Sequence, residues 1–83
     1  MSSPNSRSTG SLSTDGNPYT TAGLLHYAQA SGGVLTVYDG STSGNLLCTV
    51  GDGARTMFTT PVAFGSSGVH VQISAGSAVI HIS

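Results

Sequence analysis

GGVLTVYDGSTSGNLLCTV, residues 32–50, predicts a β-hairpin around which we expect the rest of the chain to be organised. Its two arms, 34–38 and 46–50, are rich in β-branched, aliphatic and aromatic residues, which favour strands. Between them, residues 39–44 supply the Asp, Gly, Ser and Thr chemistry of a turn. We therefore expect an antiparallel pair of short strands here.

A register that places Tyr38 opposite Asn45 predicts which side chains of this hairpin share a face. Side chains alternate along a strand and opposite residues point to the same side. One face then consists of Leu35, Val37, Leu46, Cys48 and Val50. The other face is mixed, and we expect four of its members to contact a partner subunit: Val34, Thr36, Tyr38 and Leu47.

The C-terminal segment 69–82 contains the strongest alternation of apolar and polar residues in the chain. Turning over residues 74–77 would pair Val71 with Ile80 and give this second predicted hairpin a wholly apolar face. In the same register, His70 lies opposite His81 on the other face.

The segments between the hairpins also favour strands. Residues 24–30 fit either one or two helical turns or a strand, and their shortness favours the strand. Residues 56–60 predict a short strand that Pro61 stops, and 62–64 predict another short strand or an irregular edge. The expected fold class is all-β: a small antiparallel β-sandwich or barrel of about five to seven short strands.

Residues 1–21 are rich in Ser, Thr, Asn, Gly and Pro and show no hydrophobic period. They predict an extended or flexible N-terminal arm, with the β-sandwich or barrel domain in residues 22–83. A disordered tail is the alternative. If the arm orders along a neighbouring subunit, Leu12 and Tyr19 are its natural anchors.

The chain carries almost no charge: two arginines and three aspartates, with no lysine and no glutamate. Nucleic-acid binding needs clustered basic side chains, so we expect no nucleic-acid partner. No apolar window approaches the length of a membrane span, and no signal-peptide pattern opens the chain, so we expect no membrane partner and assembly in a cytoplasm. A folded part of about 60 residues is marginally stable alone, which favours oligomerisation.

No catalytic set emerges, and we expect neither an enzyme nor a cofactor. Residues 40–44 resemble a nucleophile elbow only superficially, because the central residue is Thr42 and the context is a hairpin turn. Asp15, Asp39 and Asp52 each adjoin a glycine, as turn residues do. Cys48 is the only cysteine, and a buried small hydrophobe is the default role for such a residue.

His70 and His81 are weak candidates for a metal or proton-sharing pair. In the predicted hairpin their Cβ atoms would lie about 5 Å apart, close enough for two imidazoles to share an ion. The alternative is two surface or interface histidines that form hydrogen bonds with their neighbours. For His26 we expect a structural role.

The two segments GLLHYAQASGGVLTVYDGSTSGNLLCTV and FGSSGVHVQISAGSAVIHIS resemble small β-rich structural proteins encoded by tailed bacteriophages. The resemblance covers residues 23–82 and rests on the L-T-V-Y-D-G-x-x-x-G-x-L-L turn and the apolar terminal segment. It implies a virion structural role, most directly that of a capsid decoration, or cement, protein. Such proteins are often trimers on the capsid surface that bind the major capsid protein and extend an arm across neighbouring subunits. The alternative is a tail, neck or fibre component that binds another virion protein or a host-surface glycan.

Overall fold

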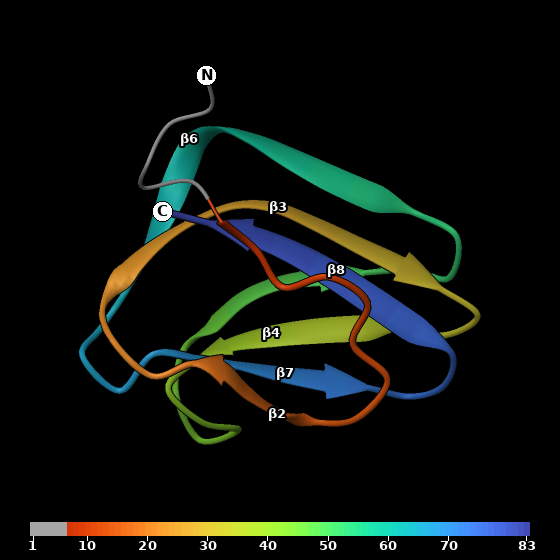
Figure 1. Ribbon diagram of the computed structural model, residues 1–83, viewed down its shortest axis with the longest axis horizontal. Coiled ribbons are helices and arrows are strands. Elements are labelled where there is room, and N and C mark those ends of the chain that lie inside the picture. The colour runs from red at the N-terminus through yellow and green to blue at the C-terminus, as the bar shows by residue number, and fades with distance from the viewer. Residues whose placement is uncertain (1–6) are drawn as a thin grey trace.

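The computed structural model describes residues 7–83, which form antiparallel β-strands and turns (Figure 1). The strands are β1 (Arg7–Ser8), β2 (Gly16–Tyr19), β3 (Gly23–Ser31), β4 (Leu35–Asp39), β5 (Leu46–Val50), β6 (Arg55–Phe64), β7 (Val69–Ile73) and β8 (Ser77–Ile82). The predicted all-β class and sandwich architecture are confirmed. Within the described part of the chain, no helix is long and apolar enough to cross a membrane.

The strands form two sheets of four, in the orders β1-β8-β3-β6 and β2-β7-β4-β5. Four of the pairings are nested in the sequence around the turn between β4 and β5: β4 pairs with β5, β3 with β6, β2 with β7 and β1 with β8. Successive nested pairs alternate between the two sheets. The chain is thus one long antiparallel hairpin rolled into a double sheet, which is the topology of the eight-stranded jelly roll.

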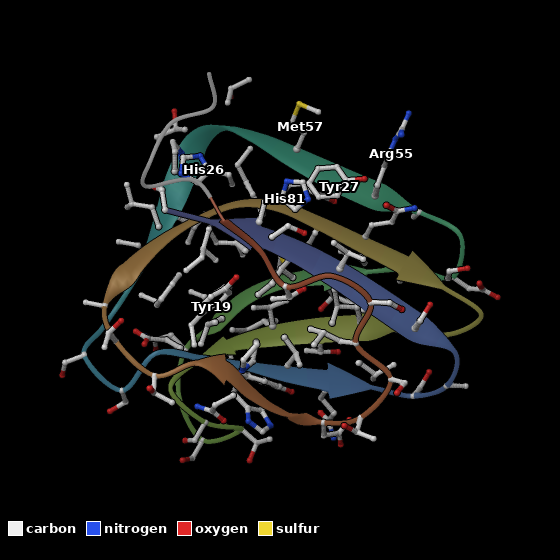
Figure 2. All side chains as sticks on the ribbon, in the orientation of Figure 1. Tyr19, His26, Tyr27, Arg55, Met57 and His81 are labelled. Atoms are coloured by element: carbon white, nitrogen blue, oxygen red, sulfur yellow. The ribbon has the colours of Figure 1, made fainter. Side chains whose placement is uncertain are left out.

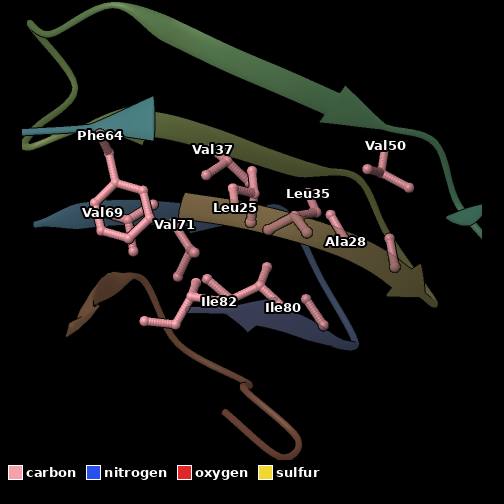
Figure 3. Packing of buried hydrophobic residues seen from close by; sticks show 12 residues of the cluster. Leu25, Ala28, Leu35, Val37, Val50, Phe64, Val69, Val71, Ile80 and Ile82 are labelled. Carbon is pink, nitrogen blue, oxygen red and sulfur yellow. The ribbon is translucent and has the colours of Figure 1, made fainter. Parts of the chain in front are cut away.

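The core lies between the sheets and is made of side chains that are at most 4% exposed (Figure 3). Alternation places these residues, because every second side chain of β4, β7 and β8 points inward. Burial of this apolar area is the main stabilising contribution to the fold. The buried residues are Leu25, Ala28, Ala30, Leu35, Val37, Val50, Phe64, Val69, Val71, Ala78, Ile80 and Ile82.

The predicted strand at 24–30 is confirmed as β3, but its faces differ from strict alternation. The register shifts between Leu25 and Tyr27 against both neighbouring strands. As a result Leu25 and Ala28 are both fully buried, and Tyr27 lies on the outer face. An irregularity of this kind inserts a residue and changes the side on which the following side chains lie.

Residues 55–64 form one long strand, β6, where the sequence predicted a stop at Pro61. Leu25 pairs with Val62 and Tyr27 with Met57, so residues 58–61 bulge opposite His26 alone. Because β6 is an edge strand of its sheet, the missing N–H of Pro61 is tolerated there.

The predicted register of the first hairpin is wrong by two residues. Val37 lies opposite Cys48, and a shift then places Tyr38 opposite Leu46. Leu46 consequently points outward and is 58% exposed, instead of sharing the core face with Val37. Between these two pairs β5 contains one residue more than β4, and this extra residue turns Leu46 to the outer face.

The predicted terminal hairpin is also wrong. β7 pairs with β4 and β2, whereas β8 pairs with β3 and β1, so the turn at 74–76 passes from one sheet to the other. Both strands still direct their apolar residues to one core, from opposite sides. The alternation of apolar and polar residues shows which face of a strand is buried. It fits a hairpin of β7 with β8 as well as it fits two strands in opposite sheets.

Residues 7–21, the described part of the predicted arm, lie along the chain's own sandwich. β1 and β2 are each one of the two edge strands of their sheets, and Leu12 forms two backbone hydrogen bonds with Ala78, of 2.7 and 2.8 Å. Leu12 and Tyr19 pack against the core of the same chain, where the sequence predicted anchors for a neighbouring subunit. Residues 1–6 of the predicted arm lie outside the described range.

Candidate interaction surfaces

The outer face of the β1-β8-β3-β6 sheet carries a row of residues that lie opposite one another across the strands (Figure 2). Met57 of β6 lies opposite Tyr27 of β3, and Tyr27 lies opposite His81 of β8. The rings of Tyr27 and His81 have centroids 4.9 Å apart and are tilted by 40°. Met57 is 76% exposed at the end of this row. We call these three residues, Met57, Tyr27 and His81, the Tyr27 row.

A more polar row lies beside the Tyr27 row. Gln29 lies opposite Arg55 on one side and Val79 on the other. The Tyr27 hydroxyl donates a 2.8 Å hydrogen bond to Gln29 Oε1 and so links the two rows. Arg55 is exposed and brings a positive charge to this face.

The outer face of the other sheet carries a matching row, which we call the Tyr38 row. Leu46 of β5 lies opposite Tyr38 of β4, and Tyr38 lies opposite His70 of β7. The ring centroids of Tyr38 and His70 are 6.3 Å apart. His70 donates from Nδ1 to Asn17 Oδ1 at 2.7 Å, and Asn17 donates in turn to the Gly40 carbonyl at 2.8 Å. The imidazole is therefore held in place.

The two rows have the same order of side chains on opposite sides of the molecule. Each begins with an exposed apolar residue on an edge strand and continues with a tyrosine. Each ends with a histidine, on the strand that lies beside β1 in one sheet and beside β2 in the other. Tyrosine offers apolar area together with a polar tip, and aromatic residues and methionine are enriched in protein interfaces. Both faces therefore have the chemistry of protein-docking surfaces.

The structure places the predicted partner residues in three different settings. Thr36 and Tyr38 share the outer face of β4, and Val34 is 40% exposed just before that strand. Leu47 packs against the core, as do Leu12 and Tyr19. Sequence reasoning missed Met57 and Tyr27 as surface residues. The sequence did contain a signal for Met57: neighbouring side chains of a strand point to opposite faces, so if Phe58 packs against the core, Met57 must point outward.

The predicted pairing of His70 with His81 is wrong. The two histidines lie on the outer faces of different sheets, because β7 and β8 belong to different sheets. Within residues 7–83, no three side chains of the His, Cys, Asp or Glu types come together as a metal site. His26 is hydrogen-bonded to the hydroxyl of Ser83, which fits its predicted structural role.

The three aspartates each connect a turn or loop to a distant backbone amide. Asp15 Oδ1 accepts from Ile73 N–H at 2.7 Å, and Asp52 Oδ1 accepts from Gly32 N–H at 2.8 Å. Asp39 Oδ1 accepts from Gly65 N–H at 2.9 Å. Hydrogen bonds to a carboxylate are stronger than neutral ones, so these contacts hold the loops in position.

Cys48 lies half-buried on β5, against the core. Burial raises the pKa of its thiol from 9.0 to about 11. The reactive species of cysteine is the thiolate, so this group is unreactive at neutral pH.

Comparisons of the chain with protein-family models, with curated proteins and with solved structures find no match.

Proposed function

We propose that this chain is a virion structural protein: a capsid decoration protein of a tailed bacteriophage that binds neighbouring major capsid subunits on the surface of the head. The observation that carries the proposal is the pair of matching rows. Two docking faces on opposite sides of one small domain would let it contact a neighbouring copy of itself and the capsid at once. The resemblance of residues 23–82 to phage structural proteins supports the same role.

The charge of the protein favours docking by apolar and aromatic contact. The whole chain has a formal net charge of −1 from two basic and three acidic side chains. Electrostatic steering is therefore weak, and affinity must come from buried area around residues such as Met57 and Leu46. Contiguous apolar surface is a mark of interaction sites, and Met57 and Leu46 each lie beside a tyrosine in their row.

The jelly roll is an architecture found in viral capsid domains, among others, and it supports the proposal only by analogy. The proposed assembly is a homo-oligomer, a trimer at local three-fold positions of the shell. In that arrangement one row of each subunit would meet its neighbour in the trimer, and the other would meet the capsid.

Copy number in purified particles tests this function. Quantitative gel densitometry against the major capsid protein should give on the order of hundreds of copies per particle for a decoration protein, since the shell repeats its local symmetry sites many times. A small multiple of three or six would instead assign the chain to a tail, neck or fibre ring. Absence from purified particles would overturn a virion role altogether.

A further inference from the structure

A polar cleft of about 480 Å³ opens at one end of the sandwich. It lies between the turn that joins β4 to β5 and the loop that joins β6 to β7. Its polar side chains are those of Asp39, Ser41, Asn45, Ser66 and Ser67, and three glycines complete its wall. Small-molecule sites have volumes of about 300–1,000 Å³, so this cleft has the size of such a site.

Hydrogen bonds between the two segments hold the cleft in shape. Asp39 Oδ1 accepts from Gly65 N–H at 2.9 Å, and Gly40 N–H donates to the Gly68 carbonyl at 3.0 Å. Asn17 Nδ2 donates to the Gly40 carbonyl at 2.8 Å and ties β2 to the same turn. A site that is formed before its ligand arrives avoids the entropy cost of ordering its loops on binding.

The lining selects the ligand by chemistry. No cationic and no large apolar side chain lines this cleft, so neither an anionic nor an apolar ligand would find a partner there. A single carboxylate provides too few ligands for a hard cation such as Ca²⁺. A neutral ligand with several hydroxyl groups fits the remaining lining, because it can donate to a carboxylate and exchange hydrogen bonds with the serine and asparagine side chains; a guanidinium group is the competing occupant.

Asp39 is placed to be the main ligand-binding group. One of its carboxylate oxygens accepts the bond from Gly65, and a carboxylate has about four acceptor sites, so acceptor capacity is left for a ligand. A Cβ atom built on Gly65 would lie 3.6 Å from Asp39 Oδ1. Glycine at this position therefore places no side chain against that carboxylate.

We propose that this cleft binds one neutral sugar ring of a saccharide. Asp39 accepts hydrogen bonds from neighbouring hydroxyl groups of the ring, while Asn45 and the serine hydroxyls complete the contacts. This activity goes beyond docking on a capsid, since it would give the exposed end of the domain an affinity for a glycan. It does not depend on whether the chain belongs to the head or the tail.

The test is a titration of the ¹⁵N-labelled full-length protein, followed by amide chemical shifts. The probes are the methyl α-pyranosides of glucose, galactose and mannose, and the expected dissociation constant for at least one of them is about 1–10 mM, as for a single small ring. The shifts should be confined to residues 39–45 and 65–68. Sodium phosphate should cause no saturable shift, because the cleft carries a carboxylate and no cation.

Asp39→Asn and Asp52→Asn form a matched pair of variants. The asparagine Oδ1 keeps an acceptor for the backbone amide in both, Gly65 or Gly32. Only Asp39 lines the cleft, so its variant should bind the sugar about tenfold more weakly, while Asp52→Asn should bind as the wild type does. If Asp39→Asn fails to fold, Ser66→Tyr, which fills the cleft from an exposed loop position, should abolish the shifts.

Several results would overturn the proposal. They are the absence of saturable shifts with all three sugars, shifts centred on Tyr27 and His81, or unchanged affinity in Asp39→Asn or Ser66→Tyr. Saturable binding of methylguanidinium, but of none of the sugars, would assign the cleft to a basic side chain of a protein partner instead. All these measurements use the isolated protein, so they can fail while the copy number still supports a capsid role, and the reverse also holds.

Discussion

The imidazole of His81 lies against the ring of Tyr27 on the outer face of β8 and β3, with the two centroids 4.9 Å apart. The other sheet repeats this relationship between His70 and Tyr38, with centroids 6.3 Å apart. Both pairs continue to an exposed apolar residue on an edge strand. A jelly roll places its two outer faces on opposite sides, so the two rows are available to two different neighbours.

Met57→Glu should weaken binding of the protein to capsid shells by about tenfold and leave its melting temperature unchanged. Met57 is 76% exposed, so the substitution costs little within the monomer but places a charge in the proposed interface. Co-sedimentation with shells that lack the protein measures the effect. Thr59→Glu, at an exposed position of the same strand, is the control for the added charge.

The corresponding change on the other face is Leu46→Glu. If the domain bridges two neighbours, this variant should also reduce shell binding or trimer formation, measured by light scattering. Normal assembly and shell binding in both Met57→Glu and Leu46→Glu would show that the rows are not docking surfaces.

Ile80→Ala should destabilise the fold by about 2–5 kcal/mol in the free energy of unfolding. Ile80 is fully buried between the sheets, and its truncation would leave a cavity as well as lose apolar burial. Val79→Ala on the neighbouring, half-buried position should cost less than about 1.5 kcal/mol. Urea denaturation measures both, and equal losses would contradict the inward orientation of Ile80.

Gly68→Ala should be much more damaging than Gly53→Ala. Both glycines have a left-handed backbone, with φ of +86° and +74° respectively, so either substitution costs about 1 kcal/mol in backbone strain. A Cβ atom on Gly68 would lie 2.0 Å from the Tyr19 carbonyl oxygen, whereas one on Gly53 would meet nothing within 4 Å. Thermal melts of the two variants should therefore differ by several degrees or more.

Removal of residues 1–21 should lower the stability of the domain or prevent folding. The deletion takes away β1 and β2, one edge strand of each sheet, together with the packing of Leu12 and Tyr19 on the core. Circular dichroism and urea denaturation of the truncated protein test this. An unchanged unfolding free energy would instead support the division into an arm, 1–21, and an independent domain, 22–83.

The protein should lose stability between about pH 9 and pH 11 because of Cys48. Burial raises its pKa from 9.0 to about 11, so the unfolded chain loses the proton first. The contribution is fully present below pH 9 and falls as pH rises towards 11. Because Cys48 is only half-buried, solvent screening limits the loss to about 1 kcal/mol. The difference in unfolding free energy between wild type and Cys48→Ala, measured across this range, should shrink accordingly; a constant difference would contradict the shift.

The sequence alone determined the fold class and most of the inward-facing residues. Alternation at Val69, Val71, Ile80 and Ile82 identified core positions correctly, because a strand that covers a core must bury every second side chain. The turn at 39–44 was recognisable from its residue types, and it is the centre around which the paired strands are nested.

The candidate surfaces were only partly predictable. Tyr38 and Thr36 were identified from the mixed face of the first hairpin. The Tyr27 row was not, because its members come from β3, β6 and β8, and the register shift in β3 that turns Tyr27 outward has no signature in the sequence.

Only the tertiary structure decided which strands pair, and therefore which side chains meet. Alternation assigns each residue to an inner or outer face but does not name the neighbouring strand, since strands of both sheets cover one core. β7 and β8 could form a hairpin or lie in opposite sheets with the same residues buried. The rolled topology selects the second arrangement, separates His70 from His81 and gives each histidine a tyrosine instead.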